Sequence, residues 1–155
     1  MVVTYGPRDS RCLYPQNAPQ AIHWAPVGGD AKAVVRDLIS AVKETVPLAA
    51  QPEAKADVAA LLERFEQCRA VDPDDVKPIA QHHCIWEMRL DIQTHGLCLR
   101  IYETEIAELP AHIVALHAHR KVISGSPEDI RTAQDNEILV ASTRWDDGRP
   151  QFWGL

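Results

Sequence analysis

Apolar residues recur at three- and four-residue steps over residues 30–68, which is the spacing of helices that bury one face. Two runs carry this period, the first with Val34, Val35, Leu38, Ile39, Val42 and Val46, and the second with Val58, Leu61, Leu62, Phe65 and Cys68. Asp30 is a suitable N-cap for the first run, Pro47 ends it, and Pro52 suits the first turn of the second. The pattern therefore predicts a helical hairpin.

The hydrophobic period changes to two further along the chain. Residues 84–92 (CIWEMRLDI), 97–104 (LCLRIYET) and 111–120 (AHIVALHAHR) each alternate apolar and polar positions. Gly96 lies between the first two segments, where it suits a tight turn that needs a positive φ. We therefore expect three consecutive antiparallel strands.

Helix signals return near the C-terminus. Residues 126–129 (SPED) have the order of a capping box, with Ser at the N-cap, Pro at the first helical position and an acid at the third. The helix that starts there is expected to run to about Ser142. In the tail, Phe152 and Trp153 are expected to dock on the domain.

These elements predict one α+β domain over residues 30–155, in which the helical hairpin packs on one face of an antiparallel meander and a C-terminal helix closes the fold. Residues 1–29 contain four prolines and predict an irregular N-terminal arm, in which AIHWAP suits an edge strand. The inner face of the third strand of the meander is expected to carry Val114, Leu116 and Ala118.

The other face of the meander is expected to be open and polar. Alternation assigns to it Glu87, Arg89, Arg100, Tyr102, His117, His119 and Lys121. Solvated sheet faces are often mosaics of this kind, and Glu87 opposite Arg100 fits a plain cross-strand ion pair. On this interpretation the face is a solvent-exposed surface without a catalytic or binding role, and Arg100 is an exposed side chain.

The charge balance limits what this face can bind. The chain of 155 residues has a formal net charge of −6 at pH 7, so the molecule as a whole repels a nucleic-acid backbone. Residues 110–126, however, contain no Asp or Glu and include Arg120, Lys121 and three histidines. No apolar run has the length of a membrane span, and the four cysteines form no CxxC pair. We therefore expect a cytoplasmic protein with no membrane contact.

Histidine, arginine and tyrosine on one face suit the cleavage of RNA. This reaction needs a base for the 2′-hydroxyl, an acid for the leaving 5′-oxygen and cations for the charge on phosphorus. Histidine moves protons near neutral pH, arginine holds phosphate, and Tyr102 can stack on an unpaired base. A zinc site is not expected at the HHC and HGLC segments, because Cys98 should lie opposite Asp91 and far from Cys84.

Four pieces of the second half of the chain resemble the RelE/ParE superfamily of type II toxins, and within it the HigB-like, phage-derived host-killer branch. They are VKPI followed by CIWEMR, then LRIYE, then IVALHAHRK, and last SPEDIRTAQDNEI. The resemblance implies a RelE-like fold and a toxin that cuts mRNA on the ribosome without metal or cofactor. Its implied partners are a helix-turn-helix antitoxin, the ribosome with its mRNA, and a second copy of the chain in a homodimer.

The resemblance also assigns roles to residues of the polar face. Together with the chemistry of RNA cleavage, it gives a catalytic set of Arg89, Arg100, His117, His119 and Lys121, and RNA-binding roles for Tyr102 and Arg120. Family members usually have two or three lysines after the histidine, whereas this chain has Lys121 alone. Two other functions stay open: an inactive toxin fold that acts as a binding or regulatory protein, and a ParE-like inhibitor of a DNA-processing enzyme.

Overall fold

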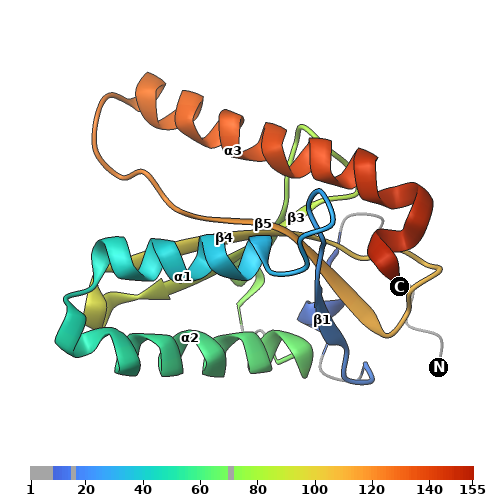
Figure 1. Cartoon of the computed structure of the whole chain (residues 1–155), viewed down its shortest axis with the longest axis horizontal. Coiled ribbons are helices and arrows are strands. Elements are labelled where there is room, and N and C mark those ends of the chain that lie inside the picture. Colours follow the sequence, from blue (N-terminus) through green and yellow to red (C-terminus); the bar gives the residue numbers. More distant parts are fainter. Residues whose placement is uncertain (1–8, 15–16, 70–71) are drawn as a thin grey trace.

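A five-stranded sheet forms the centre of the molecule (Figure 1), in a computed structural model that describes residues 9–14, 17–69 and 72–155. Its strands, in chain order, are β1 (Ala21–Trp24), β2 (Val76–Pro78), β3 (Trp86–Ile92), β4 (Leu97–Thr104) and β5 (His112–Arg120). They are arranged as β1-β5-β4-β3-β2. With the helices described below, this confirms the α+β class. Residues 1–8 and 15–16 of the predicted arm lie outside the described residues.

The three predicted strands of the meander are confirmed as β3, β4 and β5. They form two consecutive antiparallel pairs, with Met88 opposite Ile101 and Arg100 opposite His119. A short turn, η4 (Gln93–His95), joins β3 to β4, and Gly96 follows it with a φ of 60°. The glycine therefore occupies the left-handed conformation that the sequence led us to expect.

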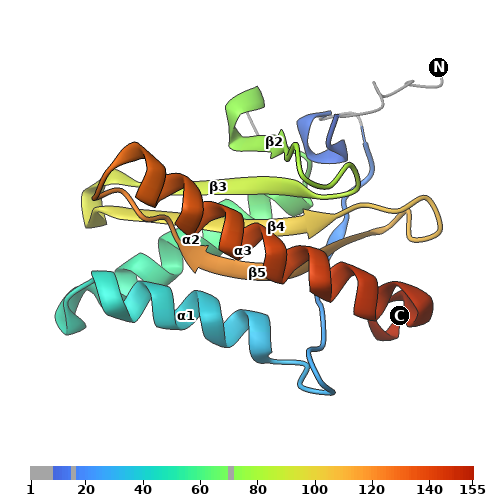
Figure 2. The same ribbon diagram turned by 90° about the horizontal axis from the view of Figure 1, so that it is seen from above.

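Helices cover both faces of the sheet (Figures 1 and 2). On one face lie α1 (Ala33–Thr45) and α2 (Gln51–Glu66), while α3 (Pro127–Gly148) lies across β4 and β5 on the other. The prediction of an open polar face is therefore wrong, because the chain turns back over the sheet after β5. Four of the side chains predicted on that face are buried: Glu87, Arg100, Tyr102 and His117.

A β-bulge in β5 changes which face its residues occupy. Tyr102 pairs with His117, whereas the next residue of β4, Glu103, pairs with Ala115, so Leu116 is the extra residue. Val114 and Leu116 consequently pack in the core beneath α3, while Ala118 packs in the core beneath α1 and α2. The prediction that these three residues share one face of the sheet is wrong, because strict alternation stops at the bulge.

The helical hairpin is present, with one difference at its start. The N-cap of α1 is Lys32 instead of the predicted Asp30. The Asp30 carboxylate accepts a hydrogen bond from the Lys32 backbone N–H (2.9 Å) and pairs with Arg36 (2.8 Å), so it stabilises the turn before the helix. Pro52 lies in the first turn of α2, as predicted.

The capping box at the start of α3 is confirmed. Ser126 Oγ accepts from the Asp129 backbone N–H at 3.1 Å, and the Asp129 carboxylate accepts from the Ser126 N–H at 3.4 Å. The helix continues past the predicted end at Ser142, because Trp145 anchors its last turns by donating from Nε1 to Thr104 Oγ1 (3.0 Å). No helix among the described residues combines the length and the apolar content needed to cross a membrane.

Both ends of the described chain pack against the sheet. The predicted edge strand is β1, which pairs in parallel with β5, Ala21 lying opposite His112. The tail forms a turn, η5 (Arg149–Gly154), in which Trp153 is 1% exposed and packs in the core beneath α3. The Trp153 carbonyl oxygen lies 2.7 Å from His23 Nε2 of β1. The tail therefore docks as expected and contacts the first strand.

Gly148 allows the Trp153 ring to reach its position, because a Cβ at Gly148 would overlap the ring atoms Cδ1 and Nε1. We expect Gly148→Ala to destabilise the protein by about 1–3 kcal/mol, the usual cost of overpacking. Thr143→Ala, at an exposed position of the same helix, should change the free energy of unfolding by less than about 0.5 kcal/mol. Urea denaturation of both variants measures the difference, and equal stabilities would contradict the close packing.

Candidate functional site

A pocket of about 70 Å³ lies between the sheet and α3. The sheet contributes Glu87, Arg89, Arg100, Tyr102 and His119, and the segment after β5 contributes Lys121 and Val122. The remaining wall is formed by α3, with Ile130, Ala133, Gln134 and Glu137. Six of the seven polar side chains that alternation placed on one sheet face therefore meet at a single site.

Five of the seven predicted site residues line this pocket: Arg89, Arg100, Tyr102, His119 and Lys121. His117 lies directly behind it, because its ring stacks on those of Tyr102 and His119, with centroids 6.4 and 5.7 Å away. Arg120 is not part of the pocket. It is exposed and pairs in register with Leu99, which belongs to the core beneath α1 and α2. Arg120 therefore belongs to the opposite face of the sheet.

Carboxylates neutralise both arginines of the pocket. Arg89 Nε lies 2.8 Å from Glu87 Oε1, and Arg100 Nη1 lies 2.7 Å from Asp91 Oδ1. Arg100 Nε is also 3.6 Å from Glu87 Oε1. Glu87 faces Tyr102 in the strand register, so the predicted placement of Glu87 directly opposite Arg100 is wrong and their ion pair is diagonal. The buried Glu87 carboxylate is compensated by two guanidinium groups, as a charge in such a place requires.

The rings of Tyr102, His119 and His117 form a stack on the β5 side of the pocket. Tyr102 and His119 lie 5.4 Å apart at an interplanar angle of 21°, and His119 Nε2 is 3.2 Å from the Tyr102 hydroxyl. Burial raises the pKa of Tyr102 well above its usual range, so the phenol keeps its proton. The neutral hydroxyl is then available as a donor or acceptor toward His119.

His117 has polar partners on two helices. Its Nε2 contacts the Glu137 carboxylate of α3, and Arg144 Nη1 donates to its Nδ1 at 3.1 Å. Asp37 of α1 approaches both His117 Nδ1 (3.9 Å) and Arg144 Nη1 (3.6 Å). Burial lowers the pKa of His117, although Glu137 opposes the effect. Since Nδ1 accepts from an arginine, the neutral tautomer with its proton on Nε2, donated to Glu137, fits these contacts.

Sequence reasoning missed the α3 wall of the pocket. Ile130, Ala133, Gln134 and Glu137 follow each other at helical steps and form one stripe along α3. Gln134 Nε2 donates to Glu87 Oε2 at 3.3 Å, so the stripe is tied to the sheet. The helical spacing is present in the sequence, but half of the stripe is polar, so the pattern alone does not mark it as a face that packs on the sheet.

The size and charge of the pocket limit its chemistry. A volume of about 70 Å³ holds a few water molecules, whereas pockets for small-molecule ligands measure about 300–1,000 Å³. The groups at hand are two arginines, one lysine, a histidine next to a phenol, and the carboxylates of Glu87 and Glu137. This set can bind an anion and move protons, but a nucleotide fits only if α3 shifts away from the sheet.

A second group of buried acids lies near the end of β4. Glu103 is fully buried, and neither of its carboxylate oxygens has a hydrogen-bond partner. Glu105 accepts from Ser10 Oγ at 2.8 Å and from the Arg11 backbone N–H at 3.0 Å. Burial is the main cause that raises the pKa of both glutamates, and it also raises the pKa of the Cys12 thiol beside them. The folded protein therefore favours the protonated form of Glu103.

Residue types that ligate metals occur in two parts of the fold. The register places Cys98 opposite Asp91, as expected, so the cysteine and histidine segments at 82–84 and 95–98 do not form a joint site. Among the described residues, one group brings its ligand atoms together: Glu53, Asp57 and His95, whose atoms lie within 4.8 Å of one another. This group was not predicted.

Comparison of the chain with protein-family models, with curated proteins and with solved structures finds no match. The α+β architecture and the pocket beneath α3 are therefore the basis on which its function is inferred.

Proposed function

We propose that the protein is the toxin of a type II toxin–antitoxin pair, with a RelE-like fold and a metal-independent endoribonuclease activity that cuts mRNA on the ribosome and so inhibits translation. The observation that supports this most directly is the convergence of five predicted residues, from three different segments of the chain, on one pocket. A plain surface mosaic does not require such convergence, and the sequence resemblance assigns three of these residues, Arg89, Arg100 and Lys121, to catalysis.

In the proposed reaction, His119 moves protons while cations stabilise the phosphate. The 2′-hydroxyl attacks phosphorus as its proton passes to a base, and the bond to the 5′-oxygen breaks as that oxygen is protonated. His119 borders the pocket with its Nε2 toward the Tyr102 hydroxyl, so both groups lie where a proton can be exchanged. Arg89, Arg100 and Lys121 supply the positive charge that the phosphorane needs.

Access to the pocket requires a movement of α3 in this proposal. The helix is tied to the sheet through Gln134 to Glu87 and through Glu137 to His117. A helix-turn-helix antitoxin is the proposed partner that holds the toxin inactive.

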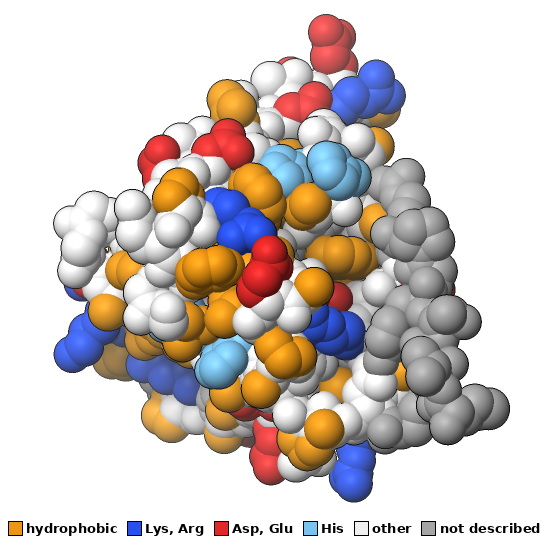
Figure 3. Space-filling model, turned by 90° about the vertical axis from the view of Figure 1, so that its right-hand side faces the viewer, with side chains coloured by type: hydrophobic (Ala, Val, Ile, Leu, Met, Phe, Trp, Pro, Cys, Tyr) orange, Lys and Arg blue, Asp and Glu red, His pale blue; other side chains and the backbone are white. Residues whose placement is uncertain are grey.

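A binding or regulatory role without catalysis is the second candidate. It is favoured by the carboxylates that neutralise Arg89 and Arg100, and by the net charge of −6. Figure 3 views the molecule from the right-hand side of Figure 1, where Lys and Arg side chains are interspersed with Asp and Glu and form no continuous basic surface. Ribosome binding driven by charge alone would need such a surface.

Induced expression of the full chain without a partner is expected to arrest growth, and the purified protein should cleave mRNA only when translating ribosomes are present. His119→Gln and Lys121→Ala should relieve both effects, since each removes a group of the pocket. His83→Gln, an exposed histidine away from the pocket, is the control and should stay toxic. Normal growth with soluble parent protein, together with intact mRNA, would overturn the nuclease proposal in favour of the binding role.

A further inference from the structure

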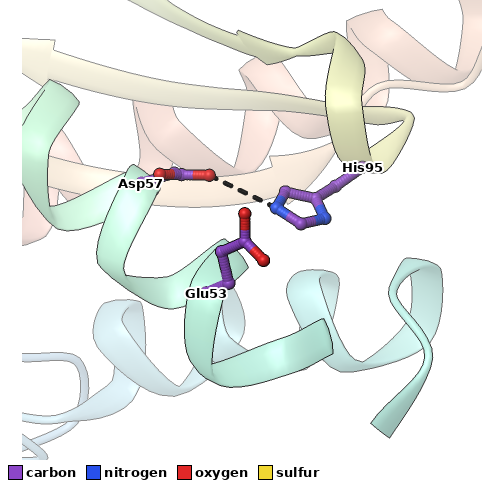
Figure 4. A group of neighbouring side chains, drawn as sticks. All are labelled: Glu53, Asp57 and His95. Carbon is purple, nitrogen blue, oxygen red and sulfur yellow. Dashed lines mark hydrogen bonds and ion pairs between the residues drawn. The ribbon is translucent and has the colours of Figure 1, made fainter. Parts of the chain in front are cut away.

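Glu53, Asp57 and His95 lie on the face of the sheet opposite the pocket and take no part in the proposed reaction (Figure 4). Two of these side chains come from the first two turns of α2, and the third comes from η4, the turn between β3 and β4. We propose that these three residues form a binding site for a divalent transition-metal ion, zinc in the first place, that clamps α2 to the β3–β4 turn.

The geometry of the three side chains suits a shared cation. Glu53 and Asp57 are four residues apart on α2 and therefore lie one above the other on the same side of the helix. Asp57 Oδ2 is 3.2 Å from His95 Nε2. Two ligands of a tetrahedral zinc ion, each about 2.1 Å from the metal, lie about 3.4 Å apart. The aspartate and the histidine therefore already have the separation of a ligand pair, and Glu53 is long enough to complete it.

The histidine is held in place before any ion arrives. Its side chain is 8% exposed and projects from the turn toward α2, and the left-handed Gly96 that follows fixes the turn (Figure 4). The Asp57 side chain is 47% exposed and Glu53 is exposed, so an ion can enter from solvent. Without an ion, His95 Nε2 and the Asp57 carboxylate share a hydrogen bond, and a bound ion takes the place of its proton.

The charge of the group also favours a cation. In the described part of the chain, neither Glu53 nor Asp57 forms an ion pair with a lysine or arginine, in contrast to the acids of the pocket. A divalent cation carries the charge that balances these two carboxylates.

The ligand types identify the class of metal. Magnesium and calcium prefer sites built from oxygen alone and take six or more ligands. Zinc accepts one imidazole with two carboxylates and completes a tetrahedron with water. The site therefore has the ligands of a zinc ion with one open position, and its placement between two elements indicates a bracing role.

Calorimetric titration of the chelator-treated full chain with zinc chloride tests the proposal. The parent is expected to bind one zinc ion and to gain melting temperature. His95→Gln, Asp57→Asn and Glu53→Gln should each lose this binding at zinc concentrations that saturate the parent. His83→Gln and Glu63→Gln, two exposed positions outside the group, should bind as the parent does.

Cobalt binding distinguishes this site from adventitious capture by the free cysteines, because thiolate ligands give a charge-transfer band in the near ultraviolet. A cobalt complex without that band, abolished in Glu53→Gln, supports the assignment. Absence of binding to the parent, a thiolate band, or unchanged binding by Glu53→Gln overturns it. Glu53 is exposed, so its substitution leaves the fold intact. A loss of binding in Glu53→Gln is then due to the missing ligand and not to unfolding.

Discussion

Glu103→Gln is expected to gain stability relative to the parent as the pH rises above the ordinary pKa of glutamate. Near pH 4 the variant and the parent should unfold at similar free energies, because a protonated glutamate and a glutamine are both neutral and similar in shape. Above the ordinary glutamate pKa of about 4.3, the parent should lose about 1.4 kcal/mol per pH unit relative to the variant, until the pH passes the raised pKa of the folded state.

The sign follows from the burial of Glu103. The carboxylate has no hydrogen-bond partner and is fully buried, so desolvation raises its pKa in the folded protein. Between the unfolded and folded pKa values, the unfolded state releases a proton that the folded state retains. The unfolded state then binds fewer protons, and stability falls with increasing pH. Glutamine has no proton to release, so the variant lacks this loss.

Urea denaturation at constant ionic strength, repeated at several pH values, measures the effect. Glu44→Gln, an exposed glutamate of α1, is the matched control and should follow the pH dependence of the parent. A difference between Glu103→Gln and the parent that stays constant over this range would show that Glu103 is ionised in the folded protein.

Arg100→Ala is expected to lower the free energy of unfolding by about 3 kcal/mol, the lower part of the range for removing one partner of a buried ion pair. Arg100 is 5% exposed, and its removal leaves the Glu87 carboxylate buried with Arg89 as its remaining cation. An exposed Arg100, as alternation in the sequence suggested, would cost no more than about 0.5 kcal/mol. Stability measurements therefore distinguish the two environments.

Under the proposed function, the same substitution should also reduce mRNA cleavage, by about 10²–10³, because a preorganised donor to the developing charge is lost. Arg36→Ala is the control for stability and for activity, since Arg36 pairs with Asp30 but its side chain is 63% exposed. Arg144 does not suit this purpose. It lies beyond the predicted helix end at Ser142, but it belongs to α3 and donates to the Leu116 carbonyl oxygen and to His117. Equal stability of Arg100→Ala and Arg36→Ala would contradict the buried network.

Elements with a strong local signal were predictable from the sequence. Alternation located all of β3, β4 and β5, with a residue or two too many at the starts of β3 and β5, and the residues Ser126 to Asp129 located the start of α3. The same alternation grouped most of the pocket residues, because Arg89, Arg100, Tyr102 and His119 share a face. These predictions rest on interactions between residues that are close along the chain or in adjacent strands.

The remaining features depend on contacts that no local pattern contains. The position of α3 was not predicted, because the stripe that faces the sheet includes Gln134 and Glu137 and thus resembles a solvated surface. The bulge at Leu116 is a single extra residue without a distinct signal, and it reversed the faces of its neighbours. The group formed by Asp57 and His95 joins a helix to a distant turn, and only the tertiary structure brings them together.

The parallel pairing of β1 with β5 has a consequence for how the chain folds. Ala21 pairs with His112, so β1 leaves the ribosome long before its partner strand is synthesised. Contacts between such distant segments raise the contact order and slow folding, since a long loop must close before they form. We expect the sheet to be completed only after synthesis of β5, with β1 as the strand that docks late. Until then its backbone is an open edge, available to other chains.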